Sequence, residues 1–342
     1  MKLKMLKYLS MLALMLFVFA SCDQDSIFAD ISVEPPPVKP RVSGSPTKLV
    51  EYGSAMYVAT INSKKIHRLS SGSWSSLDPG GNVLDLAEGS DGLYVLTYDN
   101  NVMNTALKIY DGSWSTINTG SGSVQSIYGA NGTVFAGVGS AGSVHYLDGT
   151  ALNPITGVTG VLNGVAYNGT NYYIATSDGI YQVNSSHSVT ATYSFNNVKG
   201  IIRIGDTTNI AAVTWDGRIL YGTNFASSIS SSNLNYTGAM TFWDNPSAGD
   251  NLLLLGVHNT GSYDRGYREC TLDGSGHPTS GTLKFPGDSN PSSVNPNDKS
   301  KYEASLARYS VYSILQFGDR IYASTTVNGL YVLKDGQWNA QD

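Results

Sequence analysis

The residues able to support acid–base or metal chemistry are few and scattered in this sequence. Beyond residue 46 the glutamates are Glu51, Glu88, Glu269 and Glu303. A glycoside hydrolase needs two carboxyl groups about 5–9 Å apart across its substrate, and no local pattern pairs any two of these. The five histidines show no metal-ligand spacing and stand at His67, His145, His187, His258 and His277. The sequence therefore predicts no catalytic residue, no bound metal and no cofactor.

Short motifs of other binding and enzyme classes are incomplete. Gly137-Val138-Gly139 lies in a predicted strand and turn, whereas a dinucleotide-binding glycine loop precedes a helix. Asp288-Ser289-Asn290 begins like a calcium-binding loop, but the later ligands and the central glycine of such a loop are missing. We therefore expect the protein not to be an enzyme.

The composition indicates a globular, β-rich chain and argues against nucleic acid as a partner. Hydrophobic residues make up 41% of the 342 residues, which suffices for a core, and charged residues make up 14%. The 37 glycines and 22 tyrosines suit many tight turns between short aromatic-rich strands. The formal net charge is -5, and its charges are dispersed along the chain, so no basic surface for nucleic acid is expected.

The first 21 residues have the pattern of a signal peptide. Lys2, Lys4 and Lys7 form a basic segment, and residues 8–20 are apolar except for Ser10. This apolar stretch is too short to span a bilayer comfortably, so a cleaved leader fits better than a membrane helix.

The leader ends in a sequence that resembles the lipobox of bacterial lipoproteins, Phe19-Ala20-Ser21-Cys22. The resemblance implies cleavage after Ser21 and attachment of acyl chains such as palmitate to Cys22. The protein would then be a lipoprotein anchored to a membrane of the bacterial cell envelope. The alternative is an ordinary secretory leader in which Cys22 occurs by chance. With Cys22 lipidated, Cys270 is expected to be a lone buried thiol that serves packing.

Residues 22–46 are expected to form a flexible tether that begins with the lipidated cysteine. The segment contains Pro35, Pro36, Pro37, Pro40 and Pro46. Such a proline density favours extended chain over helix or paired strand. Residues 27–33 are the exception, because they are compatible with a β-strand that could cover an open sheet edge.

From residue 47 onward the chain repeats one pattern of about 40 residues, the size of a β-propeller blade. The second apolar run of each repeat gives the clearest register, and we term its central residue the anchor of that repeat. The anchors are Tyr57, Tyr94, Phe135, Tyr173, Ala211, Leu254 and Tyr322. The repeats are expected near residues 47–81, 82–122, 123–159, 160–197, 198–237, 238–300 and 301–342.

We therefore predict an all-β fold over residues 47–342, a seven-bladed β-propeller of four-stranded antiparallel blades. A single blade is apolar on both faces, so radial stacking buries each face against a neighbour and leaves no apolar end. A sandwich of two sheets is the alternative, but it would need fewer strands than these repeats supply. Each repeat keeps its own strands, with residues 337–340 outermost in the last, so the first and last blades are expected to dock face to face.

Three corners between third and fourth strands share a Gly-x-Trp pattern. They comprise Gly72 and Trp74; Asp111, Gly112 and Trp114; and Asp335, Gly336 and Trp338. Glycine permits the positive φ of a tight turn, and aspartate accepts hydrogen bonds from the turn backbone. Tryptophan is expected to seat the outer strand against the adjacent blade.

These corners resemble degenerate Asp-box repeats of sialidase-like (BNR) and photosystem-assembly-like propellers. The resemblance extends as a pattern over residues 47–342 and implies a structural role for the corners, away from any active face. Catalytic sialidase-like propellers also carry three substrate-binding arginines, a Tyr-Glu pair and an Arg-Ile-Pro motif. The nearest match to that motif is Arg203-Ile204-Gly205, which lacks the proline.

The sixth repeat departs from the period at two points. Residues 259–266 are added between its second and third strands, and residues 286–306 between its fourth strand and the seventh repeat. In a propeller both connections emerge on one side of the ring, which we expect to bind a partner. The candidate binding lip consists of Lys299, Lys301, Tyr302 and Glu303. The alternative is a tolerated surface loop.

The function that these patterns favour is a membrane-anchored lipoprotein displaying a non-catalytic, monomeric propeller that binds a protein or a glycan at the cell envelope. Two alternatives stay open, a carbohydrate-active hydrolase and a purely structural envelope component. Arginines and carboxylates gathered at the mouth of the central channel would favour the hydrolase. A mouth lined by tyrosine, asparagine and serine would favour binding.

Overall fold

The computed structural model describes most of the chain beyond residue 41, all within one compact unit that spans residues 41–341. The described residues are 42, 44–61, 63–99, 104–119, 123–140, 142–230, 235–245, 250–258, 266–279, 306, 309–325, 329–334 and 337–341. The predicted signal peptide, Cys22 and the tether up to residue 41 lie outside them and stay predictions.

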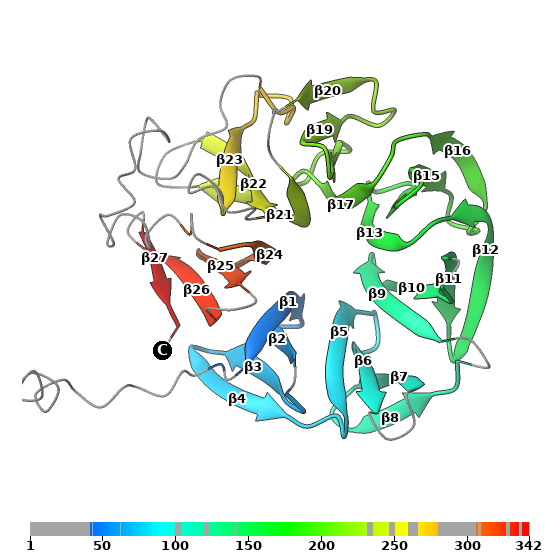
Figure 1. Cartoon of the computed structure of the whole chain (residues 1–342), viewed down its shortest axis with the longest axis vertical. Helices are drawn as coiled ribbons and strands as arrows, with labels where there is room; N and C mark the ends of the chain where they lie inside the picture. Colours follow the sequence, from blue (N-terminus) through cyan, green and yellow to red (C-terminus); the bar gives the residue numbers. More distant parts are fainter. Residues whose placement is uncertain are drawn as a thin grey trace, which may run out of the picture. The chain divides into compact units, whose positions relative to one another are not determined.

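The described residues form 27 β-strands in seven antiparallel sheets, and every regular element among them is a strand. Strands follow one another in chain order within each sheet, so each sheet is an up-and-down meander. Six sheets have four strands and one has three. The sheets are arranged radially around a centre (Figure 1). The prediction of an all-β, seven-bladed propeller is confirmed.

The first sheet comprises β1 (Ser45–Tyr52), β2 (Ala55–Ile61), β3 (Ile66–Ser70) and β4 (Ser73–Leu77). The second comprises β5 (Asn82–Glu88), β6 (Leu93–Asp99), β7 (Asn104–Tyr110) and β8 (Trp114–Ile117). The third comprises β9 (Val124–Ala130), β10 (Thr133–Val138), β11 (Ser143–Asp148) and β12 (Ala151–Thr159). The fourth comprises β13 (Leu162–Tyr167), β14 (Tyr172–Thr176), β15 (Ile180–Val183) and β16 (Val189–Tyr193).

The fifth sheet comprises β17 (Val198–Arg203), β18 (Ile210–Thr214), β19 (Arg218–Tyr221) and β20 (Ser227–Ser230). The sixth comprises β21 (Tyr236–Asn245), β22 (Asp250–Val257) and β23 (Tyr267–Thr271). The seventh comprises β24 (Val311–Phe317), β25 (Arg320–Thr325), β26 (Gly329–Lys334) and β27 (Gln337–Ala340). The sixth sheet starts two residues before the expected boundary at 238, and its predicted fourth strand falls mainly outside the described residues.

Position in the blade explains the character of each strand. Second strands such as β2 and β14 are buried along nearly their whole length, because a neighbouring sheet covers each of their faces. Their sequences are correspondingly apolar without alternation. Outer strands such as β4 and β16 are largely exposed, and their sequences are rich in serine and threonine.

The buried hydrophobic residues of the described part of the chain form seven clusters, one at each junction between neighbouring sheets. Each cluster contains one of the seven predicted anchors, and no anchor is more than 4% exposed. The anchor of each blade faces the blade that follows it, and the anchor of the seventh blade faces the first. Burial between blades, rather than within them, therefore makes the ring the stable unit.

The ring closes where β24 and β25 of the last sheet pack against β1 of the first. Tyr322 and Val332 share one cluster with Leu49 and Val58. Val42 joins this cluster and is 3% exposed. The described end of the predicted tether is therefore part of the propeller, which corrects the expectation of a flexible segment up to residue 46: β1 itself begins at Ser45.

The two sides of the ring carry different connections. The start of β1 pairs with the end of β2, Ser45 opposite Ile61. Connections between second and third strands therefore emerge on the same side as connections between consecutive sheets, and we term this side the loop face. The opposite side, termed the turn face, carries the tight turns. His258 and Ser310, which flank the two insertions of the sixth repeat, lie together at the loop face, with Ser310 Oγ 3.2 Å from His258 Nδ1.

Candidate functional site

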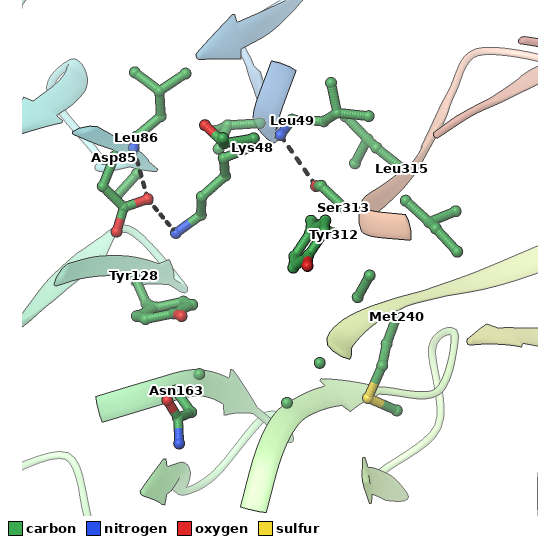
Figure 2. Close-up of a pocket in the computed structure, with 18 of the residues that line it drawn as sticks. Lys48, Leu49, Asp85, Leu86, Tyr128, Asn163, Met240, Tyr312, Ser313 and Leu315 are labelled. Carbon is green, nitrogen blue, oxygen red and sulfur yellow. Dashed lines mark hydrogen bonds and ion pairs between the residues drawn. The ribbon is translucent and has the colours of Figure 1, made fainter. Parts of the chain in front are cut away.

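A cavity of about 920 Å³ lies at the centre of the ring. Residues from the inner strands of all seven sheets line it, namely β1, β5, β9, β13, β17, β21 and β24 (Figure 2). Ligand pockets typically measure about 300–1,000 Å³, so this central channel is large enough to admit a small ligand or one unit of a polymer.

Each inner strand is interrupted by a β-bulge near its loop-face end. A bulge adds a residue that is not paired in the ladder and redirects the side chains around it. The bulged residues are Thr47, Leu84, Gln125, Asn163, Lys199 and Tyr312, with residues 237–239 in the sixth sheet. All of these positions except Gln125 line the channel. The bulges thus place chemically different side chains at equivalent positions around one mouth.

Among the described residues, side chains at or next to the bulges bond neighbouring blades at six of the seven junctions, all except the fifth–sixth. From donor to acceptor, these bonds join Leu49 N to Ser313 Oγ (3.1 Å), Lys48 Nζ to Asp85 Oδ1 (2.8 Å), Ile127 N to Asp85 Oδ2 (2.8 Å), Ser126 Oγ to Leu162 O (3.2 Å), Asn163 Nδ2 to Val198 O (2.6 Å) and Thr237 Oγ1 to Val311 O. These polar side chains of the channel wall therefore hold neighbouring blades together. The bulged Lys199 and Tyr312 at the mouth take no part in these bonds and are candidates for binding.

Lys48 is the clearest example of a channel residue that joins neighbouring blades. Its Nζ lies 2.8 Å from Asp85 Oδ1, donates to Ile127 O at 2.8 Å, and stands 3.8 Å from the centre of the Tyr128 ring. The side chains of Lys48 and Asp85 are only 21% and 13% exposed. Burial, with the Asp85 charge as the second cause, raises the pKa of Tyr128. Because both charges are partnered on several sides, this ion pair fixes three blades in position.

The large hydrophobic side chains that are more than a third exposed, among the described residues, all lie at or near the loop face. They are Ile61 (43%), Leu84 (41%), Val161 (52%), Trp215 (36%) and Tyr312 (38%). Ile61 and Leu84 belong to the first two blades, and Val161 connects the third blade to the fourth. All five thus lie on one side of the ring, and two of them, Trp215 and Tyr312, lie against the same imidazole ring.

Four residues of the fifth, sixth and seventh blades form an aromatic cluster at this face, Lys199, Trp215, His258 and Tyr312. The His258 ring lies 5.4 Å from Trp215 and 6.4 Å from Tyr312, between ring centres. Lys199 Nζ stands 5.4 Å from the centre of the Trp215 ring. Tyr312 OH and His258 Nδ1 are 3.3 Å apart. The cluster thus combines two exposed rings with a cation and an imidazole.

The turn-face end of the channel holds two of the four glutamates that follow residue 46, Glu51 and Glu88. Glu51 and Glu88 both line the channel, and Glu88 also lines an adjoining cavity of about 270 Å³. Burial raises the pKa of Glu88 to about 7, with Lys48 lowering it and Glu51 raising it. Burial also raises the pKa of Glu51. Glu88 is therefore largely protonated below neutral pH.

Other candidate catalytic groups are engaged in structural bonds. Arg203 also lines the smaller cavity, but its Nε donates to Thr207 O at 2.7 Å and its second terminal nitrogen to Asp206 O at 2.8 Å. Glu269 accepts a hydrogen bond from the hydroxyl of the fully buried Tyr267 at 2.9 Å. The structure brings Glu51 and Glu88 to one channel and leaves Glu269 elsewhere.

The predicted corner residues occupy turns of the expected type where the structure describes them. Gly72 and Gly112 have φ values of 75° and 115°, in the region that favours glycine. Asp111 Oδ1 accepts hydrogen bonds from Ser113 N at 3.2 Å and Ser113 Oγ at 3.1 Å. These bonds lower the pKa of Asp111. Asp335 and Gly336 lie outside the described residues.

The three corner tryptophans each pack into a cluster shared with a neighbouring blade. Trp74 contacts the first–seventh junction, Trp114 the first–second junction, and Trp338 the sixth–seventh junction. Trp338 is 4% exposed, and its ring meets that of Tyr267 edge-on with centres 5.1 Å apart. These side chains therefore hold outer strands to neighbouring blades.

Several predicted site residues lie outside the described part of the chain. These are Phe19, Ala20, Ser21 and Cys22 of the leader, and Lys299, Lys301, Tyr302 and Glu303 of the candidate lip. None of the residues that are described belongs to an apolar helix of membrane-spanning length. In the same part of the chain, no cluster of His, Cys, Asp and Glu is arranged to hold a metal. Cys270 is fully buried at the fifth–sixth junction.

Sequence reasoning missed the residues of the loop-face mouth. A usable signal exists, because the bulged residue stands ten positions before the anchor in most repeats, as with Thr47 and Tyr57 or Tyr312 and Tyr322. Aligning the repeats on their anchors would therefore have found Thr47 and Tyr312, and the position four residues after the anchor would have found Ile61, Trp215 and His258.

No family model matches the sequence, and no curated protein matches it. Among solved structures, the chain is similar to the WD40 β-propeller domain of Doa1, with a TM-score of 0.57 and 12% sequence identity. The match covers 86% of this chain and 93% of that one. At this level of identity the likeness shows the fold alone. By its own sheets and by this likeness, the chain is a seven-bladed β-propeller.

Proposed function

We propose that this protein is a lipoprotein of the bacterial cell envelope whose propeller binds a protein or a glycan at the loop face, without catalysis. The observation that supports the binding role is the placement of the exposed Ile61, Leu84, Val161, Trp215 and Tyr312 around one side of the ring. Propellers commonly serve as rigid scaffolds for recognition, and their loops supply the contacts.

The membrane anchor rests on the sequence of the leader. Lys2, Lys4 and Lys7 precede an apolar stretch that ends in Ala20-Ser21-Cys22. A single acyl chain gives only marginal binding to a bilayer, so two or more chains on Cys22 are needed for stable attachment.

Replacing Cys22 with alanine tests the proposed attachment to the membrane. The variant should move from the detergent phase to the aqueous phase on phase partitioning, and the mature protein should lose the mass of the acyl chains. Cys270→Ala is the matched control, because that cysteine is buried in the propeller, and it should partition like the parent protein. Unchanged partitioning and mass in Cys22→Ala would refute the proposed lipidation of Cys22.

The loop-face assignment is tested with the soluble Cys22→Ala protein, which retains every propeller residue. We expect it to bind envelope fragments of its own source. Ile61→Asp, Val161→Asp and Trp215→Asp in combination should reduce this binding by at least about tenfold, because each charge would be desolvated on contact. Asp319→Lys at the turn face, where the aspartate side chain is 91% exposed, should leave binding unchanged. Equal binding by both variants contradicts the assignment.

Hydrolysis is a second candidate function, and the specific observation in its favour is Glu88. A carboxyl group with a pKa of about 7 near a second carboxylate is suited to general acid catalysis. Under this function, Glu88→Gln would abolish release of reducing ends from a bound oligosaccharide. Under the binding function, parent and variant both leave the oligosaccharide intact.

A further inference from the structure

The aromatic cluster of Lys199, Trp215, His258 and Tyr312 differs from the rest of the loop face in its chemistry. Ile61, Leu84 and Val161 are isolated aliphatic side chains, whereas the cluster places charged and hydrogen-bonding groups beside two exposed rings. A ligand that fits it needs an apolar surface to lie on the rings and polar groups at the edge of that surface.

The cluster is held in place by the fold. Lys199 and Tyr312 are bulged residues of the inner strands β17 and β24. The backbone N–H of Trp215 donates to Asn197 O at 3.0 Å, which pins its loop to the start of the same blade. Rings fixed in this way lose little conformational freedom when a ligand binds, which favours affinity.

The same fixing applies to the imidazole. The backbone N–H of His258 donates to Asn235 O at 2.7 Å, and its Nδ1 is shared between Ser310 Oγ at 3.2 Å and Tyr312 OH at 3.3 Å. Three blades therefore meet at this ring. A ligand seated between Trp215 and Tyr312 would lie over His258 and meet hydroxyl and imidazole groups along its edge.

The charge of the cluster is positive. Among the described residues no carboxylate forms an ion pair with Lys199, whose ammonium faces the Trp215 ring. The acid that follows Trp215 in the sequence, Asp216, bonds instead to Arg218 at 3.1 Å and to the hydroxyl of Thr214. Lys199 is thus available to an anionic group that approaches along the Trp215 ring.

We propose that this cluster binds a carboxylated pyranose, as found in glycans built from uronic acids. A pyranose presents a face of C–H groups that stacks on aromatic rings, and hydroxyl groups at its rim that match Tyr312, Ser310 and His258. The carboxylate carried on C5 of the sugar would pair with Lys199 while the C–H face lies on Trp215. The inference rests on the proposed binding function of the loop face and specifies its ligand.

The test is titration of the soluble Cys22→Ala protein with tetragalacturonate and with a mannuronate tetramer, read by calorimetry and tryptophan fluorescence. Neutral galactotetraose is the matched probe without carboxylates. We expect at least one acidic tetramer to bind more tightly than the neutral one. Trp215→Ala should weaken that binding about tenfold, and Lys199→Gln about two- to fivefold. Asp319→Lys, at the turn face where the aspartate side chain is 91% exposed, should not change it.

Three results would overturn the inference. They are the absence of binding by both acidic tetramers, equal binding of neutral and acidic tetramers that is unaffected by Lys199→Gln, and binding that persists in full after Trp215→Ala. The proposed function would survive each of them if the soluble protein still binds envelope fragments through the loop face. Loss of envelope binding together with no saccharide binding would reject both. The unfolding midpoint of each variant checks its folding. For Trp215→Ala and Lys199→Gln it should match that of the parent, because both side chains lie at the surface of the loop face.

Discussion

Glu88 shows how a single side chain acquires unusual chemistry from its position in the ring. Its backbone carbonyl abuts Gly129 of the next blade so closely that a Cβ on Gly129 would lie 2.2 Å from it. The carboxyl group is thereby enclosed between the second and third blades, and burial outweighs the attraction of Lys48. The protonated form is favoured as a result, because a buried carboxylate loses its hydration.

We predict that Glu88→Gln changes how stability depends on pH. The folded pKa of about 7 lies above the ordinary value of 4.5, so the folded state binds the proton more tightly than the unfolded state. The stabilising contribution of the protonated group is present below pH 4.5 and is lost as the pH rises to 7. Glutamine cannot ionise, so at pH 8 the variant should be more stable than the parent by up to about 3 kcal/mol.

Urea unfolding of parent and Glu88→Gln at pH 4.5 and pH 8 provides the measurement. The difference in unfolding free energy should be near zero at the lower pH and should grow toward the higher one. A difference that is the same at both pH values would show that Glu88 ionises normally in the folded protein.

At the scale of strands, the fifth–sixth junction replaces a hydrogen-bonded side chain with direct backbone contact. A Cβ on Gly200 of β17 would lie 2.2 Å from the carbonyl oxygen of Gly238, and a Cβ on Gly238 would lie 2.1 Å from that of Lys199. The two inner strands can approach this closely only because neither glycine has a side chain.

We predict that Gly200→Ala destabilises the protein by about 1–3 kcal/mol, because the added methyl group must push two backbones apart. Gly274→Ala is the matched control: a Cβ on Gly274 would have no neighbouring atom within 4 Å, so its effect should stay within about 0.5 kcal/mol. Thermal and urea unfolding report both values. Equal stability of the two variants would mean that the strands separate here at no cost.

The outer strands depend on the corner tryptophans. Trp338 is 4% exposed and packs on Tyr267 of the preceding blade, whereas Trp215 is 36% exposed in a loop. We predict that Trp338→Ala lowers the unfolding free energy by about 3 kcal/mol and that Trp215→Ala changes it by less than about 0.5 kcal/mol. Chemical unfolding of both variants checks the prediction, which fails if the two losses are alike.

For the whole molecule, stability depends on closing the ring between the first and last blades. Every other junction joins blades that follow one another in the chain, but this one joins residues such as Leu49 and Tyr322 from opposite ends. Bringing such distant segments together costs chain entropy, which the closing cluster and the bond from Leu49 N to Ser313 Oγ must offset.

We predict that Val42→Ala weakens this closure. Val42 is 3% exposed within the closing cluster, so the truncation should lower the unfolding free energy by about 1–2 kcal/mol. Val161→Ala is the matched control, because Val161 is 52% exposed, and it should be neutral. A neutral Val42→Ala would show that the segment before β1 adds nothing to the ring.

The architecture could be predicted from the sequence alone. A period of about 40 residues, seven apolar anchors and Gly-x-Trp corners are local features, and each repeat must bury two apolar faces that only a neighbouring copy can cover. The seven anchors from Tyr57 to Tyr322 therefore predict the number of blades without any knowledge of the contacts between blades.

The candidate site, by contrast, exists only in the folded ring. Lys199 and Tyr312 are far apart in the chain and meet at one mouth only because the sixth blade packs between theirs and because a bulge turns each of them there. Trp215 and His258 join them from the connections that directly follow β18 and β22. The pKa of Glu88 likewise depends on a neighbouring blade. Chemistry assembled across blades leaves no local pattern, since each contributing residue is ordinary within its own repeat.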